Sequence, residues 1–376
     1  MKAEPLRPYR LLDPLLRLGR TFNKRPGPPA CVLLISAGGL GDTVLLACVL
    51  PRFLALAQPG EAVTVLLRHD SARMAFLFPP QVRVLKVEFN RLRQWAYRRQ
   101  ILGELYRAHY RLVVHTDYLR HPDLDEALVE AAAAPESAAM EPRPSAKFGK
   151  RLEANRRLYT RLYPSGPPHT DKVLRWAGFA QFLTGQVLPP PLVALPETRL
   201  PPAIIPNHPT VILQPFSAVK LKQSPPDLWD LIIGALPPHW HIKLAGHPSD
   251  LDKNPEFKRL LERPNVEFEG APFAQLAGII RGAALVVSVD TACMHLAAIM
   301  GTPTLCLASA AYVGEIVPYA EQIMPANLHV LYQPMECKGC LGACWFPPED
   351  GMYPCVAGLD PDAVLGAVRD MVARRA

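Results

Sequence analysis

Short apolar runs alternate with helical repeats along most of the chain. The clearest example spans residues 285–307. Apolar residues 285–289 stop at Asp290-Thr291, a helical repeat follows, and a second apolar run covers residues 304–307. Strand, helix and strand in this order are typical of a parallel α/β sheet.

The same alternation predicts a doubly wound α/β fold in two halves. The predicted strands are residues 31–36, 63–67, 82–87 and 112–115 in the first half and 211–214, 241–245, 266–268, 285–289 and 304–307 in the second. The predicted helices are residues 43–57, 71–78, 91–108, 171–185, 226–236, 254–262, 273–281, 291–300 and 360–374. Residues 123–144 are rich in alanine and then broken by proline, which predicts a helix followed by a loop.

Proline-rich sequence separates the two halves and indicates a linker. We therefore expect an N-terminal basic arm, a first Rossmann-like domain, the linker and a second Rossmann-like domain, at residues 1–30, 31–190, 191–209 and 210–376. Ligands of open α/β sheets bind beyond the carboxyl ends of the strands. Two such domains predict a central cleft in which each domain binds one ligand.

The composition is that of a globular protein, with 376 residues of which 49% are hydrophobic and 20% are charged. The formal net charge of +7 favours anionic partners such as nucleotide phosphates or anionic lipids. No apolar run reaches the length of a membrane span, and the basic residues 1–29 lack the apolar core of a signal peptide. We expect a cytoplasmic protein whose cysteines are reduced.

Leucine and arginine alternate in residues 9–20 of the basic arm. This segment either packs on the body of the protein or lies on an anionic surface, in peripheral contact with the inner membrane. The basic stretches contain no recognisable nucleic-acid-binding module, so nucleic acid is not an expected partner.

A glycine loop joins the first predicted strand to the first predicted helix. Gly39 and Gly41 allow the backbone to approach a ligand closely. Val44 occupies the third glycine position of the dinucleotide fingerprint, and no Gly-Lys-Ser/Thr phosphate loop is present, which argues against a dehydrogenase or ATPase. Asp42 is either a helix cap or a general base at a strand end.

The helix after residue 289 predicts an anion site in the second half. Asp290 or Thr291 would cap it, Ala292 follows, and His295 falls on its first turn. Free N–H groups and the helix dipole at such a turn suit a phosphate group.

Two further loops follow strands of the second half. Ser217 with Lys220 and Lys222 has the composition of a diphosphate clamp, although surface lysines are an equally simple interpretation. Asp250 or Asp252 would bind a ribose hydroxyl, unless this loop is a plain turn.

Four of the eight cysteines lie close together in the sequence. Cys337, Cys340, Cys344 and Cys355 have the spacing C-x2-C-x3-C-x10-C. Four thiolates at this spacing suit a tetrahedral zinc or iron ion, and reduced structural thiols are the alternative.

Four features of the chain belong to one known pattern. They are Gly41-Asp42 with the following helix and Leu50-Pro51; His169-Thr170-Asp171-Lys172-Val173 through Gly185; Asp290-Thr291 with Met294-His295-Leu296-Ala297-Ala298 and Gly301-Thr302-Pro303; and the cysteine-bearing tail followed by Leu359-Asp360-Pro361-Asp362-Ala363-Val364. In these features the chain resembles glycosyltransferase family 9, the ADP-heptose:lipopolysaccharide heptosyltransferases of the GT-B fold. The resemblance extends from about Cys31 to the end of the chain.

This resemblance implies inverting sugar transfer between two Rossmann-like domains without a catalytic metal. Asp42 would be the base that deprotonates the acceptor. Asp290 would orient the helix start, and the leaving diphosphate would be stabilised by Ser217, Lys220 or Lys222, the amides around Thr291, and His295. The donor would be an ADP-activated heptose or related sugar, and the acceptor lipopolysaccharide core, another glycan or a protein. A subset of the family glycosylates proteins and carries structural iron held by cysteines.

The chain departs from the family pattern at three places. Ala292 stands where glycine usually follows Asp-Ser/Thr, the usual lysine followed closely by Trp-Pro is missing, and Ala308-Ser309-Ala310 replaces a glycine after the last strand. These departures leave two alternatives open. One is a UDP- or GDP-sugar donor, and the other is a non-catalytic scaffold stabilised by metal.

Overall fold

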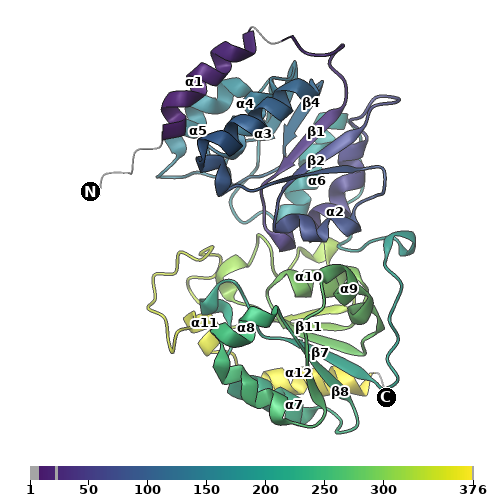
Figure 1. The fold of residues 1–376 in the computed structure, drawn as a ribbon. Helices are drawn as coiled ribbons and strands as arrows, with labels where there is room; N and C mark the ends of the chain where they lie inside the picture. Colours follow the sequence, from purple (N-terminus) through teal and green to yellow (C-terminus); the bar gives the residue numbers. More distant parts are fainter. Residues whose placement is uncertain (1–7, 22–23, 375–376) are drawn as a thin grey trace. The chain divides into compact units, whose positions relative to one another are not determined.

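The computed structural model describes residues 8–21 and 24–374, which form two compact units (Figure 1). Unit 1 consists of residues up to Thr43, Val49–Pro168 and Arg175–Leu188. Unit 2 consists of Val44–Cys48, His169–Leu174 and the residues from Pro189 onward. Each unit is an α/β structure built on a parallel sheet of six strands.

The sheet of unit 1 has the strand order β3-β2-β1-β4-β5-β6. The strands are β1 Val32–Ser36, β2 Val63–Arg68, β3 Arg83–Val87, β4 Leu112–His115, β5 Glu136–Met140 and β6 Arg161–Tyr163. This is the doubly wound Rossmann order, whose direction of winding reverses between β1 and β4. In the register of these two strands Ile35 lies beside His115, so both strands end at the same edge of the sheet.

Helices cover both faces of this sheet. They are α1 Pro8–Thr21, α2 Leu40–Leu54, α3 Trp95–Ala108, α4 Asp125–Ala132, α5 Gly149–Asn155 and α6 Lys172–Thr184, with 3-10 turns η1 Ser71–Leu77, η2 Arg91–Arg93 and η3 Arg156–Leu158. Leu33 and Ile35 of β1 point into a core shared with α3 and α4. Phe53 of α2 and Phe179 of α6 pack edge to face with ring centroids 6.0 Å apart.

The sheet of unit 2 has the order β12-β11-β10-β7-β8-β9, the same winding with its reversal between β7 and β10. The strands are β7 Thr210–Gln214, β8 His241–Ala245, β9 Val266–Glu269, β10 Leu285–Val289, β11 Thr304–Leu307 and β12 Leu328–Leu331. The helices are α7 Pro226–Ala235, α8 Pro248–Lys253, α9 Phe273–Gly282, α10 Ala292–Ile299, α11 Pro354–Ala357 and α12 Pro361–Ala373. The 3-10 turns are η4 Glu197–Arg199, η5 Lys220–Lys222, η6 Pro255–Glu262, η7 Ala310–Tyr312 and η8 Glu321–Ile323.

The α/β class and the doubly wound sheets predicted from the sequence are confirmed. The prediction was wrong at three strands, β5, β6 and β12, which the sequence analysis did not identify. Strand β5 reads Glu-Ser-Ala-Ala-Met and lacks β-branched residues, so its pairing with β4 overrides a weak local preference. Residues 123–144 therefore contain a helix and a buried strand rather than a helix and a loop.

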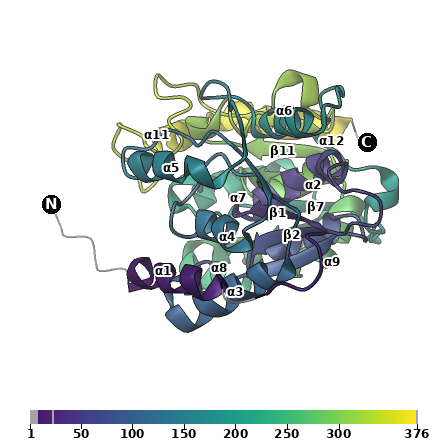
Figure 2. The same cartoon turned by 90° about the horizontal axis from the view of Figure 1, so that it is seen from above.

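Part of the basic arm forms α1, which runs alongside α3 (Figure 2). Asp13 of α1 pairs with the fully buried guanidinium of Arg98 on α3, with Nη2 and Oδ2 2.5 Å apart. Arg17 pairs with Glu130 of α4 at 2.7 Å. Among the described residues, no helix combines the length and hydropathy that crossing a bilayer requires.

The predicted linker is attached to unit 2 through two glycines of α9. Gly278 and Gly282 lie one turn apart on the helix face that meets the segment containing Ile204. The Ile204 N–H donates to the Gly278 carbonyl at 2.9 Å. A Cβ on Gly282 would lie 2.0 Å from the Ile204 carbonyl oxygen, so the two backbones can touch only because this position lacks a side chain.

We predict that Gly282→Ala destabilises the protein by about 1–3 kcal/mol, because the added methyl must displace linker backbone. The measurement is the urea or thermal unfolding midpoint. Gly234→Ala in α7 is the matched control, since a Cβ there meets nothing within 4 Å. A Gly282→Ala midpoint equal to that of the control would contradict the close packing of linker and helix.

Candidate functional site

Asp42 lies at the edge of unit 1 where β1 passes into α2. It is the third residue of the helix, and its Oδ2 accepts the N–H of Gly39, the N-cap residue, at 2.7 Å. The helix therefore begins at Leu40, earlier than the sequence predicted, because Asp42 caps it from within the first turn. Asp42 thus has a structural role as a capping residue, which leaves its role as a base a prediction.

Gly38 is the glycine of this loop on which the position of Asp42 depends. A Cβ on Gly38 would lie 2.6 Å from both Cβ and Oδ2 of Asp42, whereas a Cβ on Gly39 would approach no atom closer than 3.8 Å. The Gly38 carbonyl also accepts the buried Ser71 hydroxyl at 2.7 Å. The glycine pattern had pointed to Gly39 and Gly41 rather than to Gly38, the second residue after β1.

Gln214 connects the two strand ends at the winding reversal of unit 2. Its buried side-chain oxygen accepts the hydroxyls of Thr291 at 2.8 Å and Ser288 at 3.1 Å. Its side-chain nitrogen donates to the Phe216 carbonyl at 2.7 Å. Thr291 is the N-cap residue of α10, but its hydroxyl is bonded to Gln214 and makes no capping bond to the helix. The sequence reasoning missed Gln214 as a functional residue.

Lys222 and Asp290 form a buried ion pair beside this helix start. Lys222 Nζ lies 2.6 Å from Asp290 Oδ2, and the two side chains are 11% and 4% exposed. The ammonium also lies 4.7 Å from the centroid of the Tyr312 ring, within the range of a cation–π contact. This pair fixes a positive group next to the free N–H groups of α10.

The other two predicted donor residues on this side have different partners. Lys220 donates to Asn254 and lies 3.0 Å from Glu256, with its side chain 58% exposed. Asp250 is the third residue of α8, where its Oδ2 accepts the His247 N–H at 2.8 Å. Of the two lysines, the structure therefore places Lys222 beside Asp290, and it gives Asp250 the role of a helix cap.

His295 and Ser217 are held by local hydrogen bonds. The buried His295 ring bonds through Nδ1 to the Tyr319 hydroxyl. Burial keeps the pKa of Tyr319 well above its usual value, so at neutral pH the hydroxyl is protonated and can donate to His295. The Ser217 hydroxyl accepts the Val219 N–H at 3.2 Å. Ala292 is the first residue of α10 and is partly exposed.

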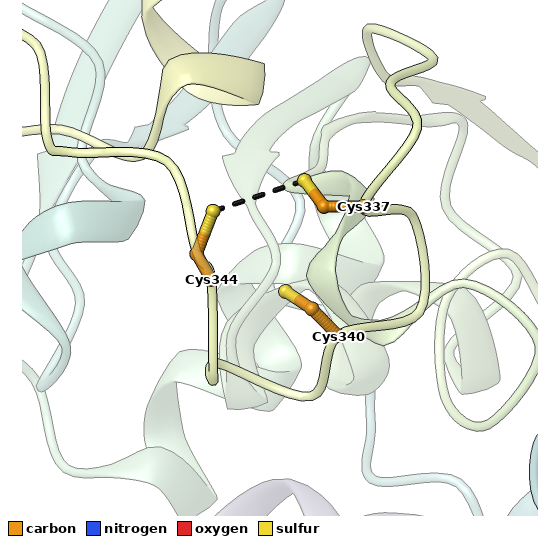
Figure 3. Close-up of side chains that lie close together, drawn as sticks. All are labelled: Cys337, Cys340 and Cys344. Atoms are coloured by element: carbon orange, nitrogen blue, oxygen red, sulfur yellow. Dashed lines mark hydrogen bonds between the residues drawn. The ribbon is translucent and has the colours of Figure 1, made fainter.

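Three of the four predicted metal ligands come together in one loop (Figure 3). The sulfurs of Cys337, Cys340 and Cys344 all lie within 4.8 Å of one another, and those of Cys337 and Cys344 are 3.7 Å apart. Tetrahedral Zn–S bonds of about 2.3 Å require sulfur separations of about 3.8 Å, so the donor set fits such an ion. Burial and the neighbouring Cys344 thiol raise the pKa of Cys337 to about 11.

The predicted fourth ligand, Cys355, lies outside this group of three. Its sulfur accepts the Ala310 N–H at 3.3 Å, and burial raises the pKa of its thiol. Electrostatic interaction with Cys340 and Cys344 also raises that pKa, so Cys355 is near the group although not within it. The structure thus supports three ligands in place and leaves the fourth as a prediction.

The segment that carries the four cysteines, residues 337–355, is called the cysteine loop here. Backbone hydrogen bonds attach it to the segments around the buried ion pair. Gly339 and Leu341 donate to the carbonyls of Ala310 and Ala311 at 2.8 and 2.7 Å. Tyr353 donates to the carbonyl of Leu221, the neighbour of Lys222, at 2.8 Å. The cysteine loop therefore supports both the lysine segment and the turn η7 that carries Tyr312.

Part of the sequence and the whole fold match known proteins. Residues 193–345 match the family model of glycosyltransferase family 9 (heptosyltransferase). The fold is similar to that of Escherichia coli ADP-heptose lps heptosyltransferase II, with a TM-score of 0.64 and 13% identity over 92% of this chain and 99% of that one. It is equally similar to E. coli heptosyltransferase WaaC with ADP, with a TM-score of 0.64 and 20% identity over 92% and 98% of the two chains.

An iron-containing dodecameric glycosyltransferase, TibC from enterotoxigenic E. coli, is more distant. Its TM-score is 0.50, with 12% identity over 93% of this chain and 78% of that chain. No curated protein matches the sequence significantly.

The two doubly wound units have the GT-B fold of the heptosyltransferase structures, and residues 193–345 carry a sequence match to a glycosyltransferase family. The resemblance to glycosyltransferase family 9 is confirmed, and residues 193–345 are the part of the chain that carries the family match.

We predict that Lys222→Met lowers the stability of the protein by about 3–5 kcal/mol, because it leaves the buried Asp290 carboxylate without its counter-ion. Adding Asp290→Asn should restore part of this loss in a double-mutant cycle of unfolding free energies. Lys220→Met is the matched control, since its exposed pair with Glu256 should contribute less than about 1 kcal/mol. Equal losses in the two lysine variants would refute the buried pair.

Proposed function

We propose that the protein is an inverting glycosyltransferase that moves a heptose or related sugar from an ADP-sugar to a hydroxyl group of lipopolysaccharide core, another glycan or a protein. The observation that carries the proposal is the placement of Asp42. It lies at the winding reversal of one Rossmann-like sheet, on the loop where such sheets bind ligands. The family match and the structures of E. coli heptosyltransferase WaaC with ADP and with ADP-2-deoxy-2-fluoro heptose support the donor class.

In the proposed reaction, Asp42 removes the proton of the acceptor hydroxyl. The hydroxyl oxygen then forms a bond to the anomeric carbon from the face opposite the diphosphate. The bond between the anomeric carbon and the diphosphate oxygen breaks, and the nucleoside diphosphate leaves with the electron pair. The configuration of the sugar is thereby inverted, and no metal ion is needed to balance the step.

The helix start of α10 is the proposed site for the departing diphosphate. The first N–H groups of the helix, around Thr291 and Ala292, lack helical acceptors and attract negative charge. Lys222 adds a fixed positive charge held in place by Asp290. Ser217 and His295 complete the proposed set. Lys222 is preferred to Lys220 because its ammonium is buried beside the helix start, whereas the Lys220 side chain is exposed and paired with Glu256. Asp250 stays a predicted contact to a ribose hydroxyl. Donors fixed before the reaction stabilise developing charge without reorganisation.

We predict that Asp42→Asn abolishes sugar transfer and leaves ADP affinity unchanged. Asparagine can still accept the Gly39 N–H, so the helix cap persists while the base is lost. Transfer from ADP-heptose is measured with a lipopolysaccharide-core acceptor, and ADP, UDP and GDP binding by calorimetry.

Lys222→Ala is the complementary variant, in which ADP binding should weaken. Full transfer by Asp42→Asn would disprove the base assignment. Selective binding of UDP or GDP would change the proposed donor to a UDP- or GDP-sugar. If no nucleotide binds, the result favours a non-catalytic scaffold protein.

We further propose that the cysteine loop binds one structural zinc or iron ion through Cys337, Cys340 and Cys344, with Cys355 as the fourth ligand. The sulfur separations and the iron of the TibC neighbour support this assignment. When bound, the ion would bring the thiols to the thiolate form and hold the loop.

We predict about one metal ion per chain, by elemental analysis of anaerobically purified protein, and its loss in Cys337→Ser together with a lower melting temperature. Cys31→Ser, at a partly buried cysteine far from the cluster in sequence, is the control and should keep the metal. Metal-free wild-type protein would refute the site.

A further inference from the structure

The loop that carries Asp42 is held at its other end by a second carboxylate, Asp117. This residue follows β4 and is 6% exposed. Its Oδ2 accepts the N–H of Ala37, the first residue after β1, at 2.5 Å. Asp42 Oδ2 accepts the N–H of Gly39 two residues further on. The glycine loop, residues 37–42, is thus attached to one carboxylate near each end.

The hydrogen bond from Ala37 to Asp117 stands in place of a backbone hydrogen bond that β1 and β4 do not form. Beyond Ile35, whose carbonyl accepts the Thr116 N–H at 2.9 Å, the next bond of a parallel ladder would run from Ala37 to the Thr116 carbonyl. That carbonyl instead accepts the indole N–H of Trp176 at 2.7 Å. The Asp117 side chain accepts the Ala37 N–H instead of that carbonyl. The ladder of hydrogen bonds therefore ends here, and the chain turns into the glycine loop.

The position of Asp117 is itself fixed by a residue of β4. Its own N–H donates to Nδ1 of His115, a fully buried residue at the end of β4, at 3.2 Å. Nε2 of the same ring lies 3.6 Å from the buried Asp125 carboxylate. The turn after β4 is therefore held by buried side chains.

We infer that Asp117 is a positioning residue for the transfer reaction, which sets the distance of Asp42 from the acceptor hydroxyl through the glycine loop. The inference rests on the proposed function, in which Asp42 is the base. Because the sheet offers Ala37 no backbone acceptor, the Asp117 side chain holds the start of the loop at a fixed point. Misplacement of a reacting group by about 1 Å lowers the rate strongly without loss of substrate binding.

The test compares Asp117→Ala, Asp117→Asn and the control Asp123→Asn. Asp123 lies in the same segment, is buried to a similar extent and pairs with Arg151. Amide hydrogen exchange of the glycine-loop peptide should rise about tenfold or more in Asp117→Ala, because the anchored N–H loses its acceptor. The Asn variant should keep most of the protection, and the control should match wild type.

Steady-state kinetics supply the second readout. We expect kcat to fall about tenfold or more in Asp117→Ala with the donor KM unchanged, and partial recovery in Asp117→Asn. If Asp117→Ala fails to fold, Asp117→Ser replaces it in the test. The serine side chain is too short to reach the Ala37 N–H, so we expect the same rise in loop exchange and the same fall in kcat.

If the amide hydrogen exchange of the glycine loop in Asp117→Ala equals that of the wild type, the inference is overturned, whether or not Asp42 is the base. Equal losses of kcat and melting temperature in Asp117→Ala and Asp123→Asn also overturn it, because they indicate general destabilisation. Raised loop exchange in Asp117→Ala together with full transfer by Asp42→Asn leaves the anchoring in place and rejects the proposed base instead.

Discussion

Both units depend on a side chain that bridges two strand ends where the winding of the sheet reverses. In a doubly wound sheet the two central strands diverge at this point into loops on opposite faces, and no crossover helix covers the gap. Gln214 bridges the ends of β7 and β10 in unit 2, and Asp117 bridges the ends of β4 and β1 in unit 1. Each bridge ends the ladder in a defined geometry, so the following helix starts from a fixed point.

The buried charges of unit 2 follow from this arrangement. Asp290 comes directly after β10 and is nearly inaccessible, so its carboxylate needs a counter-ion. Lys222 supplies it from the short turn after β7, and Tyr312 lies under the same ammonium from the loop after β11. Three loops from three neighbouring strands therefore meet at one positive group, which makes its position a property of the sheet rather than of any single loop.

The sequence predicted the strongly apolar strands well and missed short strands of mixed composition, for a physical reason. Strands such as β10 are buried on both faces and read as continuous apolar runs, whereas β5 and β6 are short and carry alanine, arginine or glutamate. For the site, motif spacing predicted Asp42 as the base, which stays a prediction, and four clustered cysteines, of which the structure brings three together. It could not choose between Lys220 and Lys222, because their partners Glu256 and Asp290 are distant in sequence and only the fold pairs them. Gln214 and Asp117 were missed because each acts through a neighbouring strand.

The attachment of the cysteine loop bears on how the protein acquires its structure during synthesis. The carbonyl of Leu221 receives its hydrogen bond from Tyr353, and the turn η7 receives two from the loop around Gly339. The ribosome produces the lysine segment long before the residues that hold it. A nascent chain that already contains β7 to β11 can form the centre of the second sheet, yet its lysine turn lacks this hydrogen bond until Tyr353 has emerged. This corner of the molecule is therefore completed well after the centre of its sheet.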